Sequence, residues 1–147
     1  MENFVITQFT SLYVANDPAG RKTQFVNRHS ACFIITRKGK IRFTYDGGCV
    51  IAQSGAPVFL PQGLSYLNEC LENAESYVFN FQTAEKNHPP MQLSAIADSI
   101  VLESYEKINA LSDSSILSDR LSIFEALYSL AGRLMGDGAS RDSDSLA

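Results

Sequence analysis

The feature that most constrains the fold of this chain is a regular succession of short β-branched and aromatic runs, separated by turn residues, from Phe4 to Gln82. This rhythm is typical of an antiparallel β-sandwich or barrel, in which each run forms one strand. A closed or nearly closed barrel would remove the exposed edges that many short strands otherwise present. The predicted strands are residues 4–9, 11–15, 23–27, 32–38, 40–46, 49–53, 57–60, 65–70 and 76–82.

The clearest predicted hairpin joins residues 33–37 to residues 40–45 through a tight turn at Lys38-Gly39, where glycine tolerates a positive φ. Along the second of these strands, apolar and polar side chains alternate and therefore point to opposite faces. We expect one face to be buried (Ile41, Phe43 and Tyr45) and the other to be solvated (Lys40, Arg42 and Thr44).

The strand rhythm ends at His88-Pro89-Pro90, and helical periodicity follows. Residues 103–111 predict a short helix, and Ser112 to Ser115 form a linker that supplies an N-cap. Residues 115–135 predict a second helix whose apolar arc is wide enough to contact both its own barrel and a partner. We therefore expect a β-barrel at 1–90, a helical dimerisation element at 91–136 and a flexible linker at 137–147. The apolar arc has two rows, one of Leu117, Leu121, Phe124, Tyr128, Ala131 and Met135, the other of Ile116, Ile123, Leu127, Leu130 and Leu134.

Composition narrows the classes of function. The 147 residues are 45% hydrophobic and 19% charged, which is ordinary for a globular domain, and the formal net charge of -4 argues against a surface for duplex DNA. The odd set of Cys32, Cys49 and Cys70 predicts free thiols rather than a disulfide framework or a zinc site. The N-terminal sequence resembles neither a signal peptide nor a membrane span, so we expect a cytoplasmic protein.

Residues 55–63, GAPVFLPQG, match the second motif of the cupin barrel family, in which glycines and a proline shape sharp bends. Metal-dependent cupins continue with a histidine at the position that Tyr66 occupies here. If Gly39 is the turn glycine of the first cupin motif, Val26, Arg28 and Cys32 stand where that motif has its metal ligands. We therefore expect a metal-free barrel without a cofactor.

No catalytic constellation was found, because the chain has no G-x-S-x-G motif, no P-loop and no C-x-x-C pair. Its only histidines, His29 and His88, are far apart in the sequence, and we expect exposed or structural roles for both. A cluster of glutamates in a polar segment is expected to be solvated (Glu69, Glu72 and Glu75). The sequence therefore predicts a protein that is not an enzyme.

Several segments together resemble the N-terminal domain of the arabinose-regulator (AraC) family of bacterial transcription regulators. They are Arg28, FIITRKGKIRFTY around Gly39, SGAPVFLPQGLSY, and YVFNFQ at the end of the barrel, followed by two helices. The resemblance covers residues 20–135. It implies a metal-free cupin-like (double-stranded β-helix) barrel followed by two α-helices, in which the barrel binds an effector and the second helix pairs two protomers.

By position, the resemblance implies a ligand site at Arg28, Tyr66, Asn68, Ser76 and Val78, and a dimer face at Leu117, Leu121, Phe124, Tyr128 and Ala131. The expected partners are a small metabolite, such as a sugar, and a second copy of the chain. DNA would be bound only through a C-terminal helix-turn-helix domain absent from this sequence. The alternatives are a stand-alone cupin that binds a sugar, or an isomerase or dioxygenase of that fold.

Overall fold

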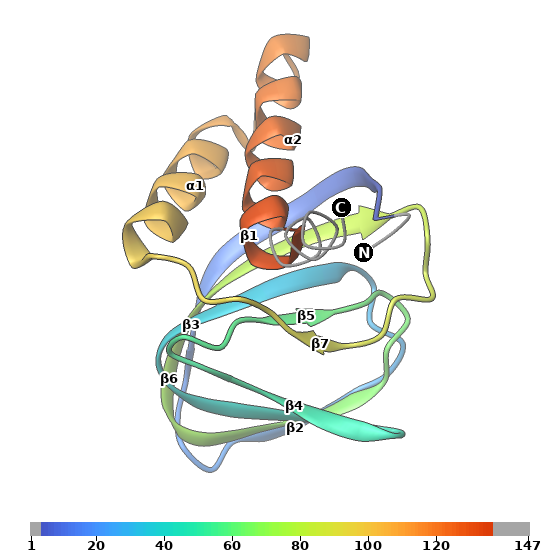
Figure 1. The fold of residues 1–147 in the computed structure, drawn as a ribbon, viewed down its shortest axis with the longest axis vertical. Coiled ribbons are helices and arrows are strands. Elements are labelled where there is room, and N and C mark those ends of the chain that lie inside the picture. The colour runs from blue at the N-terminus through green and yellow to red at the C-terminus, as the bar shows by residue number, and fades with distance from the viewer. Residues whose placement is uncertain (1–3, 137–147) are drawn as a thin grey trace, which may run out of the picture.

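The computed structural model describes residues 4–136, which form one curved antiparallel sheet followed by a pair of helices (Figure 1). The predicted fold class, a mainly β barrel followed by two α-helices, is confirmed. The elements are β1 (Ile6–Asp17), β2 (Lys22–Phe25), β3 (Ala31–Tyr45), β4 (Gly48–Gln53), β5 (Val58–Leu60), β6 (Tyr66–Thr83), β7 (Met91–Gln92), α1 (Asp98–Leu111), α2 (Leu117–Ala131) and a π-helical turn, η1 (Gly132–Gly136).

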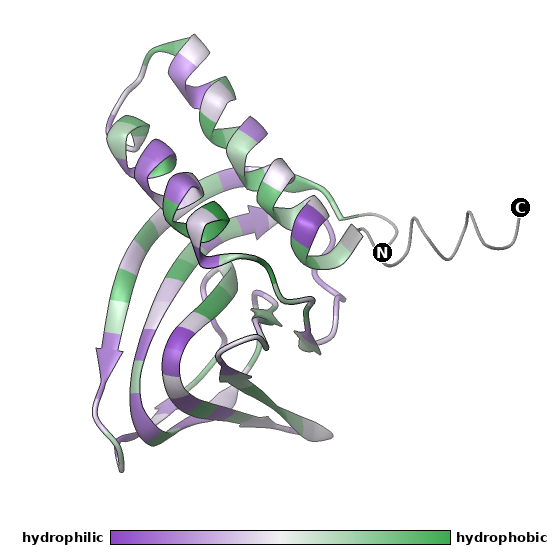
Figure 2. Cartoon of the chain, turned by 60° about the vertical axis from the view of Figure 1, so that its left-hand side comes forward, coloured by the Kyte–Doolittle hydropathy of each residue, from purple (hydrophilic) through white to green (hydrophobic). Residues whose placement is uncertain are grey.

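Two long strands, β3 and β6, pair with each other along nearly their whole length and are shared by both halves of the barrel. The first half of β3 and the second half of β6 lie with β1, β5 and β7, whereas their other halves lie with β2 and β4. The long strands of the sheet curve strongly (Figure 2). Three pairs of predicted short strands are therefore three continuous strands, β1, β3 and β6.

The predicted hairpin at Lys38-Gly39 is wrong, because β3 runs through this point and bends there. The register between β3 and β6 shifts on either side of Lys38, as in a β-bulge. Gly39 has φ +85°, and a Cβ atom placed on it would clash with the backbone oxygen of Asn73 on β6. The glycine is thus required for a close approach of two bent strands as well as for its backbone conformation.

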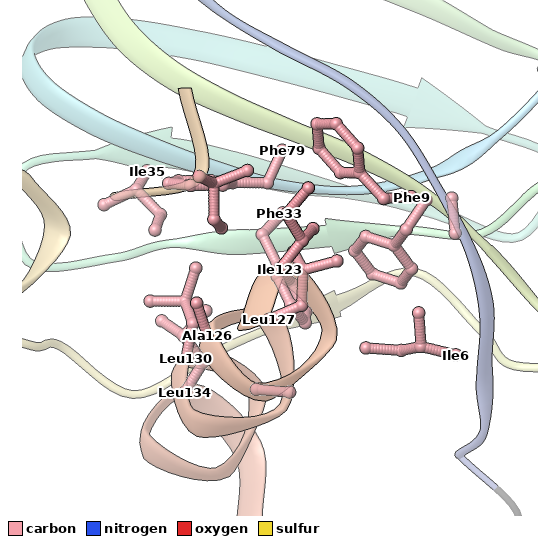
Figure 3. Packing of buried hydrophobic residues seen from close by; sticks show 14 of the residues in the cluster. Ile6, Phe9, Phe33, Ile35, Phe79, Ile123, Ala126, Leu127, Leu130 and Leu134 are labelled. Carbon is pink, nitrogen blue, oxygen red and sulfur yellow. The ribbon is translucent and has the colours of Figure 1, made fainter. Parts of the chain in front are cut away.

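The helices cover the outer face of the half-sheet that contains β1, and this contact forms the helix-side core. Alternate β3 residues, Phe33 and Ile35 among them, point outward into it, together with Phe79 of β6. From α2, Ile123, Leu127 and other buried side chains pack against them (Figure 3). Because helices cover this half-sheet, both faces of β3 are buried from Ala31 to Thr36, and the expected wet face occurs only beyond this stretch.

A second core, the barrel interior, lies between the two halves of the sheet. It contains the β3 residues that alternate with those of the helix-side core, including Cys32 and Ile34, and the buried ring of Phe43. Val78 of β6 and Leu60 of β5 also belong to it. The alternation of side chains along one strand thus separates the two cores.

The helices differ from their predicted bounds in ways that local packing explains. α1 begins at Asp98, a turn and a half before the expected residue 103, because Val101 is buried in the helix-side core. α2 lacks a side-chain N-cap, although the Ser114 hydroxyl accepts a hydrogen bond from the Ile116 N–H (3.1 Å). No helix in residues 4–136 has the length and hydrophobicity to cross a membrane. The predicted linker at 137–147 lies outside the described residues.

Candidate functional site

A cavity of about 290 Å³ opens into the barrel interior, and all five predicted ligand residues line it. Arg28 reaches it from the loop after β2, and the other four lie on the inward face of β6. β1 and β3 complete the wall. The predicted ligand residues in this cavity are Arg28, Tyr66, Asn68, Ser76 and Val78.

The backbone of Arg28 is held by hydrogen bonds to the turn at the end of the segment GAPVFLPQG. The Arg28 N–H donates to the carbonyl of Leu64 (2.8 Å), and the N–H of Gly63 donates to the carbonyl of Arg28 (2.7 Å). The preceding residue, Asn27, adopts a φ of 54°, and its N–H donates to the Ser65 hydroxyl (2.9 Å). Asparagine is one of the few residues that tolerate this conformation, and here it turns the chain so that Arg28 enters the barrel.

The Arg28 guanidinium is held by two neutral acceptors from β6. Nη1 donates to the Tyr66 hydroxyl and Nη2 donates to Asn80 Oδ1, both at 2.7 Å. Its Nε is shielded from solvent and has no hydrogen-bond partner among the described residues. The Asn80 amide in turn donates from Nδ2 to the Ser11 hydroxyl of β1 (3.2 Å). Arg28 is therefore positioned rigidly, and part of its donor capacity is unused.

Tyr66 forms one aromatic wall of the cavity. Its ring stacks on Phe25 of β2, with centroids 5.0 Å apart, and meets Phe43 edge-on at 5.8 Å. Burial disfavours the phenolate and raises the pKa of Tyr66 to about 12, although the nearby Arg28 charge acts in the opposite direction. At neutral pH this residue is thus a neutral hydrogen-bonding group on an aromatic surface.

The other three predicted residues differ in what they can offer a ligand. Ser76 is almost fully buried, and its hydroxyl is bonded to that of Thr36 at 2.8 Å. Val78 is buried and contributes only apolar surface. Asn68 is half-buried, and its amide makes no hydrogen bond to any described residue, so it can bond to a ligand.

Sequence reasoning missed the contribution of β1. Tyr13 and Asp17 line the cavity, and Asp17 pairs with Arg21 at the mouth (Nη1 to Oδ1, 3.5 Å). It also missed Asn80, which holds Arg28. A polar residue within the apolar run YVFNFQ was a signal for Asn80, whereas no local pattern marks β1 as a cavity wall.

The structure also places the residues considered for metal binding or catalysis. Val26 is 76% exposed and lies outside the cavity, while Cys32 is buried in the barrel interior. His29 is exposed, and His88 packs against the rings of Phe4 and Phe59. The described residues contain no group of three or more His, Cys, Asp or Glu side chains that could hold a metal ion. The cluster of glutamates is paired with cations on neighbouring strands (Lys22 and Arg42 with Glu69, Lys40 with Glu72, Arg37 with Glu75).

The predicted dimer residues of α2 differ in how far they are exposed. Leu117 and Leu121 are 71% and 59% exposed, and Phe124 is partly buried. Tyr128 is 41% exposed, but its hydroxyl accepts from the Ile6 N–H (2.7 Å) and donates to the Ile6 carbonyl (3.3 Å). Ala131 is 4% exposed in the helix-side core, so its assignment to a partner-facing surface is wrong. A short side chain at this position packs inward because the end of α2 approaches the sheet.

Fold and site together define a class: a small β-barrel with a mixed polar and apolar cavity, followed by a helical hairpin that covers one outer face. No protein-family model matches the sequence, and no curated protein matches it either. Solved structures do match, at 11–12% identity, and this likeness shows a shared fold.

Three of the similar structures are of ToxT from Vibrio cholerae. An apo form superposes with a TM-score of 0.57 and 12% identity, over 88% of this chain and 57% of ToxT. A form bound to (E)-4-(8-methylnaphthalen-1-yl)but-3-enoic acid has a TM-score of 0.53 and 11% identity, over 83% and 55%. A form bound to an unsaturated fatty acid has a TM-score of 0.51 and 12% identity, over 87% and 55%. This chain therefore spans a little more than half the length of ToxT.

Proposed function

We propose that this chain is the effector-sensing part of an AraC-type bacterial transcription regulator and that it binds a small molecule in the barrel cavity. The observation that carries the proposal is the convergence of Arg28, Tyr66 and Asn68 on one cavity. The fold shared with ToxT, which has been seen bound to an unsaturated fatty acid and to (E)-4-(8-methylnaphthalen-1-yl)but-3-enoic acid, supports it. On this proposal, DNA is bound by a domain that this chain does not contain.

The proposed role is non-catalytic, because the groups that line the cavity are suited to binding. Burial raises the pKa of Tyr66 to about 12, and its hydroxyl accepts a hydrogen bond from Arg28. Asp17 is paired with Arg21. Tyr66 is therefore not poised to release a proton near neutral pH.

A structural change in the cavity on effector binding would be transmitted to the helices through β1. One end of this strand lines the cavity at Tyr13 and Asp17, and Asn80 connects Ser11 to Arg28. The other end, at Ile6, is held by the Tyr128 hydroxyl of α2. A ligand that draws Arg28 away from Asn80 would therefore change the position of β1, and β1 is hydrogen-bonded to α2 through Tyr128.

To test effector binding, a library of sugars and organic acids is screened by thermal unfolding, and hits are measured by calorimetry. Val78→Phe places a larger ring in the cavity and should abolish binding, whereas Val14→Phe makes the same change on an exposed part of β1 outside the cavity. The proposal fails if no compound binds saturably, or if Val78→Phe binds as the wild type does. Turnover of a hit, detected by NMR, would favour the isomerase or dioxygenase alternative.

We also propose a homodimer formed by the exposed face of α2 at Leu117 and Leu121. Tyr128 is unsuitable as a probe of this face because it clamps Ile6 within the same protomer. Leu117→Asp combined with Leu121→Asp should yield a folded monomer in sedimentation, since an unpaired charge is costly at an apolar contact. Leu102→Asp, on an exposed position of α1, is the control. A wild-type chain that is monomeric at high micromolar concentration would contradict the dimer.

A further inference from the structure

The Arg28 guanidinium has donors to spare in the cavity. A guanidinium carries five N–H groups, and the two hydrogen bonds to Tyr66 and Asn80 occupy only part of this set. Both acceptors are neutral. Nε has no partner among the described residues and no access to solvent. The guanidinium is thus held in place, while the N–H groups of Nη1 and Nη2 that Tyr66 and Asn80 do not use can donate to another acceptor.

The charge of Arg28 is also uncompensated. The ion pairs within residues 4–136 involve other cations, and Arg28 belongs to none of them. The remaining charged groups of the cavity wall, Asp17 and Arg21, neutralise each other at the mouth. Since burial raises the pKa of both Cys32 and Tyr66, neither supplies a negative charge at neutral pH. A part-buried cation without a counter-ion is unfavourable, and an anionic ligand would relieve that cost.

The remaining walls select a ligand with an apolar body. Rings of Phe25, Phe43 and Tyr66 form one side, and Ile34 and Val78 contribute aliphatic surface. The cavity of about 290 Å³ suits a compact molecule.

On the β6 side of the cavity, few polar groups are free to satisfy the several hydroxyls of a sugar. The other polar lining residues, Tyr13, Asn16, Asp17 and Arg21, lie on β1 and in the loop that follows it. Ser76 is bonded to Thr36, and Asn80 is used by both Arg28 and Ser11, which leaves Asn68 as the free amide of β6. A sugar bound against β6 and the aromatic stack would therefore leave hydroxyls unpaired there, at a cost that a mainly apolar molecule avoids.

We propose that the effector is a small organic carboxylate with an apolar or aromatic body, whose carboxylate accepts hydrogen bonds from Arg28 while its body rests on the Phe25–Tyr66 stack. This inference rests on the proposed effector-sensing function and specifies its ligand class. Charge-assisted bonds from a guanidinium to a carboxylate are among the stronger contacts that a protein makes to a ligand.

The test compares acids with amides of the same shape: benzoate with benzamide, and octanoate with octanamide, with inorganic phosphate as a generic anion. Binding is measured by thermal unfolding and calorimetry on wild type, Arg28→Met and the control Lys22→Met. Lys22 is an exposed cation that does not line the cavity. We expect at least one acid to bind about tenfold more tightly than its amide, which corresponds to about 1.4 kcal/mol. Arg28→Met should lose this preference and Lys22→Met should keep it.

Arg28→Lys keeps the positive charge but lacks the planar set of guanidinium donors. It serves as the second variant if Arg28→Met fails to fold. It should bind the acid more weakly than the wild type and still prefer the acid over the amide.

Three results would overturn the inference: amides that bind as well as acids, acids that bind equally to Arg28→Met, or phosphate that binds as well as the acids. Failure of every acid at millimolar concentration would overturn it too. A neutral compound that binds the wild type but not Val78→Phe would refute the carboxylate and preserve effector sensing. If no compound of any class binds, both proposals fail.

Discussion

The two cores of this protein share strands but are built differently. On the helix side, aromatic and aliphatic side chains from β1, β3, β6, α1 and α2 fill the space, and the ring of Phe33 lies 4.8 Å from that of Phe81. In the barrel interior, the inward faces of the strands present aromatic, aliphatic and polar groups around a cavity. Adjacent isoleucines illustrate the contrast, because Ile35 packs under the helices while Ile34 lines the cavity. The helix-side core is therefore closely packed, whereas the barrel interior is less closely packed and leaves a cavity.

The largest expected effect compares these two isoleucines, which are both 6% exposed. Ile35→Ala should lower the free energy of unfolding by about 3–4 kcal/mol, because it removes contacts on all sides. Ile34→Ala should cost only about 2 kcal/mol, since its side chain already borders empty space. Urea unfolding of both variants gives the difference, and equal costs would remove the distinction between the cores.

The next effect concerns Gly39, at the bend where the two halves of the sheet meet. Gly39→Ala should destabilise by about 2 kcal/mol or more, because the new Cβ meets the backbone oxygen of Asn73 at a positive φ. Gly47→Ala is the control, since Gly47 also has a positive φ (106°) but faces open space, and it should cost about 1 kcal/mol. If the two variants unfold at the same urea concentration, close strand approach at Gly39 is not a determinant of the fold.

Alkaline pH should destabilise the protein through Tyr66 of the barrel interior. The pKa of Tyr66 is raised from 10 to about 12, so between these values the unfolded chain loses this proton before the folded one does. The stabilisation is therefore complete below about pH 10 and is lost as pH rises toward 12, by on the order of 1–2 kcal/mol. Stability measured across this range should fall more steeply for the wild type than for Tyr66→Phe. Parallel curves would place Tyr66 in a more solvated setting.

The smallest effect tests the link between the two regions. Tyr128→Phe removes the hydroxyl that clamps Ile6 and should cost about 1 kcal/mol. The Ile6 amide should also exchange its hydrogen faster. Tyr105→Phe serves as the control, since the Tyr105 ring packs on Tyr77 and Phe79 without a hydroxyl bond to a described residue. Unchanged exchange at Ile6 would mean that β1 is held by β6 alone.

The sequence predicted the fold class and much of the cavity, because both depend on local patterns. Alternation along the chain identified the β-region. The family resemblance placed Tyr66 and Asn68 just beyond the turn glycines of GAPVFLPQG, which have a positive φ in the structure, and both residues line the cavity. Gly39 was misread because a positive φ serves a turn and a bulge equally well, and only pairing with β6 distinguishes them.

Long-range contacts account for what the sequence did not predict. The role of Asn80 depends on Arg28 and Ser11, which lie 52 and 69 positions away in the chain. Tyr128 was placed on a partner-facing row by helical periodicity, which cannot register a hydrogen bond to Ile6. Ala131 fits either row by its size, and its burial follows from how closely α2 approaches the sheet.

The clamp between Tyr128 and Ile6 also bears on how the chain folds. It joins residues 122 positions apart, and β1 pairs along its length with β6, whose strand begins at Tyr66. During synthesis, β1 therefore leaves the ribosome well before any partner for its edge exists. Such pairing is slow, because a long loop must close before its contacts form. Until α2 emerges, the outward apolar side chains of β1 and β3 have no cover, so the newly made barrel passes through a period in which it is prone to aggregation.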